Sequence, residues 1–475
     1  TEKMLAEIWK DVLHVSIIGI HEEFFSLGGS SIKNIMIVDA ANQQGFTIDI
    51  QDVFTYDTIH KLASHIDSSN NGLLHLKKSL HETEEASLNL TPTQQFLLQN
   101  NDGDINKSCV GMTFRIAKQL SQNKVASALK RVIENHPIYT WGFKFENVTY
   151  YPLILASEID DIFHVVRIES NDEIDINNKM SCIEQTVKKS FDISNKPLIS
   201  GTFIELPKCV EHNYLTIYMH HLVTDAFSWK IFIEDLTTAL HSESTIQKEV
   251  TSYQQWASRL YHLSYSSVIK DQVPFWQSIV NQANQVPSII KNTDSELHDE
   301  QSLSFSRQFT DNLRLFSNLT KSTFDELLIT ILHIAYKNWT GRSTLTLCLL
   351  SHGRHSPYND ISLVRTIGPC TILYPVVIDD NNKLNGFMDN LSAVKQMLRS
   401  IPLGGLGYFL NAYANTGMNE QFRINNPTVL FNYMGDFGKR SEKDLLTRID
   451  TLSNRGITTE IHHHGLSVVG HELDG

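Results

Sequence analysis

The sequence predicts a multidomain protein in which a small all-α bundle of four helices precedes a larger α/β region built from two lobes. Two observations support this prediction. Residues 1–70 contain four short stretches of apolar residues at helical spacing, and they hold four basic against ten acidic residues, a net charge of −6 out of −13 for the chain. The rest of this 475-residue chain mixes strand and helix patterns and is too long for a single hydrophobic core.

Composition places the chain among ordinary globular proteins. Hydrophobic residues make up 41% and charged residues 20% of it, which excludes a disordered or collagen-like protein. The sequence shows no basic stripe of the kind that binds nucleic acid, no apolar run near the roughly 20 residues that span a bilayer, and no signal peptide. Its five cysteines are far apart and lack zinc spacing. We therefore expect a cytoplasmic protein without nucleic-acid or membrane partners.

The first four helices are expected within residues 1–71. The first follows from the spacing of Met4–Leu13, the second begins at Ser31, a short third lies around Val53, and a fourth follows Thr58, which can cap it. Together they form a small bundle.

A glycine pair stands where the second of these helices begins, in the segment Phe24-Phe25-Ser26-Leu27-Gly28-Gly29-Ser30-Ser31-Ile32. Alone, Gly-Gly-Ser-Ser is equally typical of a turn with a helix cap. With the preceding phenylalanines and the acidic bundle, the segment resembles the attachment motif of peptidyl carrier proteins in nonribosomal peptide synthetases. This resemblance implies that Ser31 receives 4′-phosphopantetheine, and the dipole of a helix start favours the phosphodiester. Carriers that precede epimerization domains usually have aspartate where this chain has Ser30.

The remaining boundaries follow from composition and length. Residues 72–88 mix charges with few apolar anchors and are expected to be a linker. We place an N-lobe at residues 89–270 and a C-lobe at residues 271–475. Helices are expected from Pro92, with Thr91 as its cap, and over residues 121–136.

A histidine pair stands at the end of an expected strand, Tyr214–His220, and before a new helix. A lone pair would more often be structural. Here the ten residues His220-His221-Leu222-Val223-Thr224-Asp225-Ala226-Phe227-Ser228-Trp229, which we name the histidine loop, resemble a signature of the condensation and epimerization superfamily. That superfamily is built as two chloramphenicol-acetyltransferase-like lobes around a tunnel. Further segments resemble the epimerization branch and follow in its order: Leu90–Phe96, Tyr253–Trp256, His352–Arg354, Arg365–Gly368, Gly404–Tyr408 and Phe431–Gly435.

The resemblance implies that the protein inverts the α-carbon of an aminoacyl or peptidyl thioester held on the carrier. Removing a weakly acidic α-proton needs a positioned base, and inversion needs a proton on the opposite face. By resemblance, His221 is one acid/base, with His220 beside it in the site, and Tyr433 lines the tunnel. Asp225 is interpreted as a residue that holds the histidine loop in shape.

The family's second acid/base, a glutamate, is missing. Aligning His352-Gly353-Arg354 with its motif puts Leu350 at the glutamate and Ser351 at the following glycine. Three interpretations follow. The domain still epimerizes, with Tyr433, His352 or a water replacing the glutamate. Alternatively it uses His221 alone for condensation, acyl transfer or elimination, or it is a catalytically silent docking module. We take the first as the working hypothesis.

Other features define partners and exclude chemistry. The sequence has no adenylation motifs, so we expect an adjacent adenylation domain, a phosphopantetheinyl transferase and a downstream condensation domain as partners. Three consecutive histidines, His462–His464, alternate faces on a strand and cannot share one ion, so no metal site is expected. A hydrolase using Ser228 or Ser351 lacks the Gly-x-Ser-x-Gly elbow.

Overall fold

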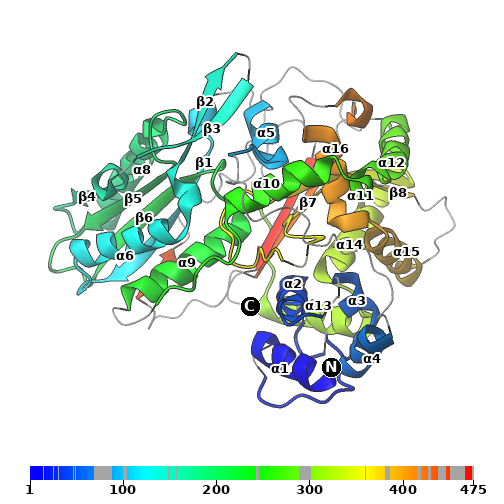
Figure 1. Cartoon of the computed structure of the whole chain (residues 1–475). Helices are drawn as coiled ribbons and strands as arrows, with labels where there is room; N and C mark the ends of the chain where they lie inside the picture. The colour runs from blue at the N-terminus through cyan, green and yellow to red at the C-terminus, as the bar shows by residue number, and fades with distance from the viewer. Residues whose placement is uncertain are drawn as a thin grey trace.

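The computed structural model describes residues 1–13, 15–24, 26–29, 31–46, 48, 50–68, 88–99, 104–147, 149–156, 158–241, 245–287, 301–358, 360–379, 386–414, 419–425, 429–436, 445–449 and 466–472. Within this part of the chain a helical module precedes a region with two large sheets, which confirms the predicted fold class (Figure 1). The predicted linker and the three consecutive histidines lie largely or wholly outside the described residues.

The N-terminal module contains the four predicted helices. They are α1 (Glu2–Leu13), α2 (Ser31–Gln43), α3 (Ile50–Thr55) and α4 (Ile59–Ser68). Their apolar faces meet in a core of their own around fully buried Trp9 and Phe24. The Thr58 hydroxyl accepts the amide hydrogen of Lys61 at 3.2 Å, which confirms the predicted cap of the fourth helix.

The first large sheet has the strand order β10-β1-β6-β5-β4. Its strands are β1 (Cys109–Ala117), β4 (Phe163–Arg167), β5 (Ile199–Glu205), β6 (His212–His220) and β10 (Leu446–Ile449). The helices near it are α6 (Gln122–Asn135), α7 (Ile159–Ile162), α8 (Glu173–Ser190) and α9 (Ala226–Leu240), and β2 (Trp141–Glu146) forms a hairpin with β3 (Thr149–Ile154). Helix α5 (Pro92–Gln99) packs against α16 (Leu406–Tyr413) beside the second sheet. The expected helices at Pro92 and at 121–136 are confirmed, and the expected strand before the histidine pair begins two residues earlier, at His212.

The second large sheet has the order β11-β9-β7-β8. Its strands are β7 (Thr344–Ser351), β8 (Ile372–Asp379), β9 (Val429–Asp436) and β11 (Leu466–Glu472). The helices around it are α10 (Tyr253–Ser264), α11 (Ser267–Lys270), α12 (Val273–Gln285), α13 (Arg307–Thr320), α14 (Phe324–Thr340), α15 (Phe387–Arg399) and α16 (Leu406–Tyr413). No helix among the described residues is long and apolar enough to cross a bilayer.

The lobes are interleaved in a way that the sequence boundary at residue 271 did not anticipate. Strand β10, from the stretch assigned to the C-lobe, pairs antiparallel with β1 in the first sheet, and the chain then returns to the second sheet as β11. One continuous hydrophobic core extends through both sheets. The loops after β6 and β7 therefore meet at the seam between two firmly joined lobes (Figure 1).

Candidate active site

The two histidines at the end of β6 have different environments. His220 is fully buried; its Nδ1 accepts the Leu222 amide hydrogen at 3.1 Å, and its Nε2 lies 2.7 Å from the Ile105 carbonyl oxygen. The ring proton is therefore on Nε2. Burial, with His221 beside it, lowers the pKa of His220 to about 3, so it stays neutral at physiological pH. His221 is half-buried, and its amide donates to the Ser108 carbonyl at 2.9 Å, which fixes its backbone against β1.

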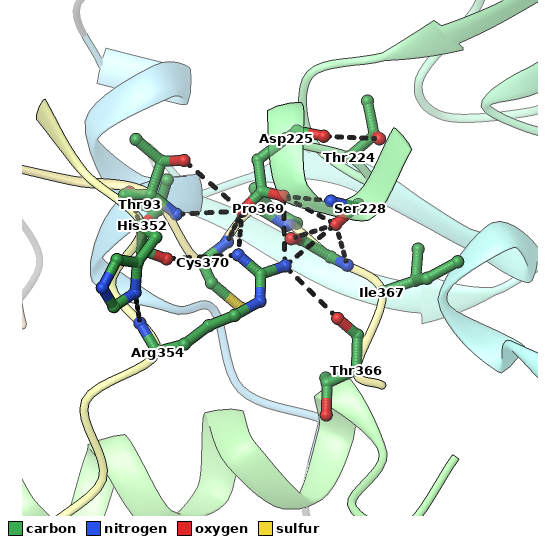
Figure 2. A network of polar contacts seen from close by, with 12 residues as sticks. Thr93, Thr224, Asp225, Ser228, His352, Arg354, Thr366, Ile367, Pro369 and Cys370 are labelled. Atoms are coloured by element: carbon green, nitrogen blue, oxygen red, sulfur yellow. Dashed lines mark hydrogen bonds and ion pairs between the residues drawn. The ribbon is translucent and has the colours of Figure 1, made fainter. Parts of the chain in front are cut away.

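Asp225 ties the histidine loop to the opposite lobe (Figure 2). It caps α9, accepting hydrogen bonds from the amide and the hydroxyl of Ser228, both at 2.7 Å. Across the seam, Arg354 donates to both carboxylate oxygens, at 2.9 and 3.1 Å. Burial alone would raise the pKa of Asp225, but the Arg354 guanidinium and Ser228 hold it below its usual range. Asp225 therefore stays ionised and positions the loop.

The segment that faces Asp225 from the C-lobe is shaped by a glycine. Gly353 has φ +64°, and a Cβ there would lie 1.7 Å from the Cys370 carbonyl oxygen. The amides of Cys370 and Thr371 also donate to Asp225, at 3.0 and 3.2 Å. The sequence placed Asp225 and Arg354 in separate motifs but did not pair them, although opposite charges in two motifs of one expected site were a usable signal.

The two residues at the missing glutamate end strand β7. Leu350 is opposite Leu373 of β8 and packs against the hydrophobic core, and Ser351 follows it as the last residue of the strand. Neither supplies a carboxylate. Beyond them, the rings of His352 and His355 lie 4.6 Å apart between centroids. Burial lowers the pKa of both, that of His355 to about 4, so His352 is a weak base at neutral pH.

Tyr433 lies on β9 within a polar group that the sequence did not predict. Its hydroxyl donates to Glu472 on β11, and Arg314 of α13 also donates to Glu472. Gly470 is opposite Tyr433 in the parallel pair, and Phe324 stacks on the Tyr433 ring with the two ring centroids 5.6 Å apart. Burial and then Glu472 raise the pKa of Tyr433, so the phenol keeps its proton. Glu472 belongs to no motif, and we find no sequence signal for it.

The proposed attachment residue, Ser31, begins α2. The turn before it has Gly28 at φ +80°, and a Cβ on Gly29 would lie 2.5 Å from the Phe24 ring, so the glycines are required there. The Lys33 ammonium donates to the Gly28 carbonyl at 2.9 Å. A tight turn that leads into a helix N-terminus fits a phosphodiester-linked group.

Helix α2 faces both lobes of the larger region. The Asp39 carboxylate accepts a hydrogen bond from Ser362, in the segment after β7, and burial raises the pKa of Asp39 to about 6. Burial and the like charge of Lys230 on α9 lower the pKa of Lys33. The helix that begins at Ser31 therefore lies near the seam where the histidine loop meets the C-lobe.

The residues of a serine hydrolase and of a metal site are arranged for neither chemistry among the described residues. The Ser228 hydroxyl is fully buried and is engaged by Asp225, Arg354 and the Gly368 backbone, an arrangement typical of a structural residue. Within the described part of the chain, no group of three or more His, Cys, Asp or Glu side chains is arranged to hold a metal ion.

Comparison with known families divides the chain in two. A family model described as a condensation domain matches residues 84–474, and one described as a phosphopantetheine attachment site matches residues 4–66. A phosphopantetheine attachment site, the cofactor site implied by the resemblance to carrier proteins, is thereby shown within residues 4–66.

Curated relatives are much longer than this chain. Surfactin synthase subunit 2 of Bacillus subtilis (strain 168) is 28% identical over 458 residues, which are 93% of this chain and 12% of that protein. Tyrocidine synthase 1 of Brevibacillus parabrevis is 26% identical over 474 residues, 94% of this chain and 41% of that protein. The chain thus spans less than half of either relative.

Solved structures share the fold. The epimerization domain from the third module of tyrocidine synthetase B aligns with a TM-score of 0.70 at 23% identity, covering 81% of this chain and 88% of that one. The condensation domain of the Monacolin K polyketide synthase aligns with a TM-score of 0.61 at 15% identity, covering 81% and 88%. The X-domain from teicoplanin biosynthesis aligns at 0.54 and 16%, covering 78% and 83%.

Proposed function

The chain belongs to the condensation-domain family, and from this membership we propose that it is a carrier–epimerization didomain of a nonribosomal peptide synthetase. Its larger region converts the L-aminoacyl or L-peptidyl thioester on Ser31 into the D form. The observation that carries the proposal is His221: a half-buried imidazole on a loop fixed from behind by neutral His220 and from the side by the Asp225–Arg354 pair. The adenylation domain that loads the carrier, the transferase that modifies Ser31 and the condensation domain that receives the product are proposed as its partners.

His221 takes the α-proton from one face of the substrate. Attached to Ser31, phosphopantetheine would present the substrate as a thioester, in which the α-proton is more acidic than in an ester or acid. His220 cannot compete as a base, because its Nδ1 is engaged by the Leu222 amide and its pKa is about 3. A positioned base of this kind contributes roughly 10²–10⁴-fold in rate.

Tyr433 is proposed to deliver the proton to the opposite face. Its hydroxyl keeps its proton and donates to the Glu472 carboxylate, which positions it. After the phenol has given this proton to the α-carbon, the phenolate takes a proton from water, and His221 releases the α-proton to water. Leu350 cannot supply the carboxylate of the family's glutamate, whereas the Tyr433–Glu472 pair places a carboxylate, that of Glu472, beside the proposed proton donor. His352 is less suitable, because burial and His355 make it a weak base.

Leu350 also supports a second candidate, condensation. Amide formation between two tethered substrates needs one acid/base rather than two groups on opposite faces, and His221 supplies one. Loss of the second carboxylate would then be without consequence.

The test is α-proton exchange in deuterated water. The transferase loads the full chain at Ser31 with L-alanyl and, in parallel, L-phenylalanyl phosphopantetheine, and the released amino acid is analysed for deuterium and chirality. We expect deuterium together with D-isomer, loss of both by at least 10²-fold in His221→Ala, and loss of inversion in Tyr433→Phe and Glu472→Gln. Tyr151→Phe, on exposed β3 of the N-lobe, is the matched control.

The outcomes separate the two candidates. Deuterium without D-isomer, or neither of them, contradicts epimerization. An amide product with an added aminoacyl acceptor carrier, abolished by His221→Ala, would then establish condensation.

A further inference from the structure

One contact between the carrier, residues 1–68 of the described chain, and the C-lobe is made by a lysine, Lys321. The Lys321 ammonium lies 2.8 Å from a Glu23 carboxylate oxygen and 3.0 Å from a carboxylate oxygen of Asp57. Glu23 precedes the attachment turn, and Asp57 precedes α4, so one cation joins two loops of the carrier. In Figure 1 the carrier helices lie against α13, which Lys321 directly follows.

The backbone of Lys321 is held in a defined conformation. It ends α13 in the left-handed region, with φ +50°, and its amide donates to the carbonyls of Ser317 and Asn318. The Arg399 guanidinium donates to the Lys321 carbonyl at 3.0 Å. An uncommon left-handed lysine therefore projects from a turn that is fixed at both its amide and its carbonyl.

Arg399 adds a second point of contact with the carrier. Its guanidinium makes two hydrogen bonds to the buried Glu326 carboxylate, at 2.7 and 3.1 Å, and lies 5.6 Å from the centre of the Phe54 ring of α3. The α13–α14 turn and the end of α15 thus form one surface. From it, Lys321 contacts the two acidic loops of the carrier, and Arg399 contacts the Phe54 ring.

We propose that Lys321 is the docking determinant with which the C-lobe selects its own carrier, and that the surface fits carriers with carboxylates at both the Glu23 and the Asp57 positions. The proposal rests on the carrier function proposed above, since it names the partner of the same domain. It also gives the acidity of the N-terminal module a specific use: two of its carboxylates converge on a single cation.

The burial of the three groups indicates how the contact acts. The side chain of Asp57 is 9% exposed, whereas those of Glu23 and Lys321 are 40% and 49% exposed. The hydrogen bonds that the Lys321 ammonium donates to Glu23 and then to Asp57 raise the pKa of Lys321, so it is charged at all physiological pH values. Exposed pairs are weak and screened by salt. We therefore expect a docked state that is readily released, and that is lost as ionic strength rises.

The experiment measures docking in the unloaded full chain by Förster transfer. One dye is placed on carrier helix α4 through Ser64→Cys, and the other on Cys182 of α8, with Cys209→Ser removing the other exposed thiol. The docked-to-undocked ratio is measured from 50 to 500 mM salt for Lys321→Glu, for Glu23→Lys, which changes an exposed carrier residue, and for the two combined. Lys130→Glu on α6 is the matched control, because it reverses the same charge away from the carrier.

We expect each single reversal to lower the docked-to-undocked ratio about tenfold, since a weak attraction becomes a repulsion. The combined swap should recover at least half of the decrease in the logarithm of the docked-to-undocked ratio. In Lys130→Glu this ratio should stay within twofold of that of the unsubstituted chain. If Lys321→Glu and Glu23→Lys behave like Lys130→Glu, or if the swap restores nothing, the proposal is wrong. Because the readout needs no chemistry, docking with no α-proton exchange contradicts only the proposed function, and exchange with salt-independent docking contradicts only this inference.

Discussion

The pair of Asp225 and Arg354 is the place where a single substitution should have the largest effect on the larger region. The side chain of Arg354 is 0% exposed and that of Asp225 is 5% exposed. Substituting Arg354→Met keeps most of the volume and leaves a buried carboxylate without its cation. Breaking one partner of a buried pair typically costs about 3–5 kcal/mol of unfolding free energy.

The remaining contacts of Asp225 refine this magnitude. The carboxylate keeps hydrogen bonds from the amide and hydroxyl of Ser228 and from the amides of Cys370 and Thr371. These donors place the cost near the lower end, about 3 kcal/mol. Loss of the contact between the guanidinium and the Phe227 ring, 4.3 Å away, adds about 0.5–1 kcal/mol.

The assay is urea unfolding followed by tryptophan fluorescence, with Trp229 buried in the first turn of α9, the helix that Asp225 caps. We expect Arg354→Met to cost about 3–4 kcal/mol, and Asp225→Asn combined with Arg354→Met to cost less than the sum of the single variants by at least about 2 kcal/mol. A loss below about 1 kcal/mol in Arg354→Met, or strict additivity, would refute the reasoning. α-Proton exchange by Arg354→Met should also fall without urea, where the variant is still folded, because the histidine loop that carries His221 is then no longer held in position.

Three further effects follow from the geometry. The pKa of His220 is about 3 in the folded state and about 6.5 in the unfolded state, so the unfolded state binds the extra proton first as pH falls. The free energy of unfolding should therefore decrease as pH drops below about 6.5. In His220→Gln, the slope of unfolding free energy against pH, measured by unfolding at pH 4–7, should be smaller by up to about 1.4 kcal/mol per pH unit. Gly353→Ala should lower the free energy of unfolding by more than about 3 kcal/mol, because the new Cβ would lie 1.7 Å from the Cys370 carbonyl oxygen. Gly341 also has a positive φ but has open space around it, so Gly341→Ala should lower that free energy by only about 1 kcal/mol. Equal losses in urea unfolding would contradict this account. The raised pKa of Asp39, about 6, means that the folded chain holds this proton more tightly, so the carboxylate is destabilising above pH 6; Asp39→Asn should stabilise the chain by about 1–2 kcal/mol at pH 7.5 and leave it unchanged at pH 4, as thermal unfolding can check.

Local patterns predicted the elements well. The spacing of apolar residues located α1 and α6, and the Thr58 cap located the start of α4, because each depends on residues within one or two turns. The lobe boundary was less successful. Strand β10 joins the first sheet through pairing with β1, more than 300 residues earlier in the chain, and no local signal specifies a strand partner at that separation.

The sequence by itself determined the carrier bundle with its phosphopantetheine attachment motif, the superfamily, the histidine loop, and the presence of Leu350 where the family has a glutamate. Each of these is written in neighbouring residues, so a single chain read in order contains it. Only the tertiary structure decided that His220 is neutral and that Asp225 pairs with Arg354, 129 residues away. It also decided that the Tyr433 hydroxyl donates to Glu472 and that two carrier carboxylates meet Lys321. Charge pairing and pKa depend on which groups are desolvated together, and packing of distant segments alone decides that.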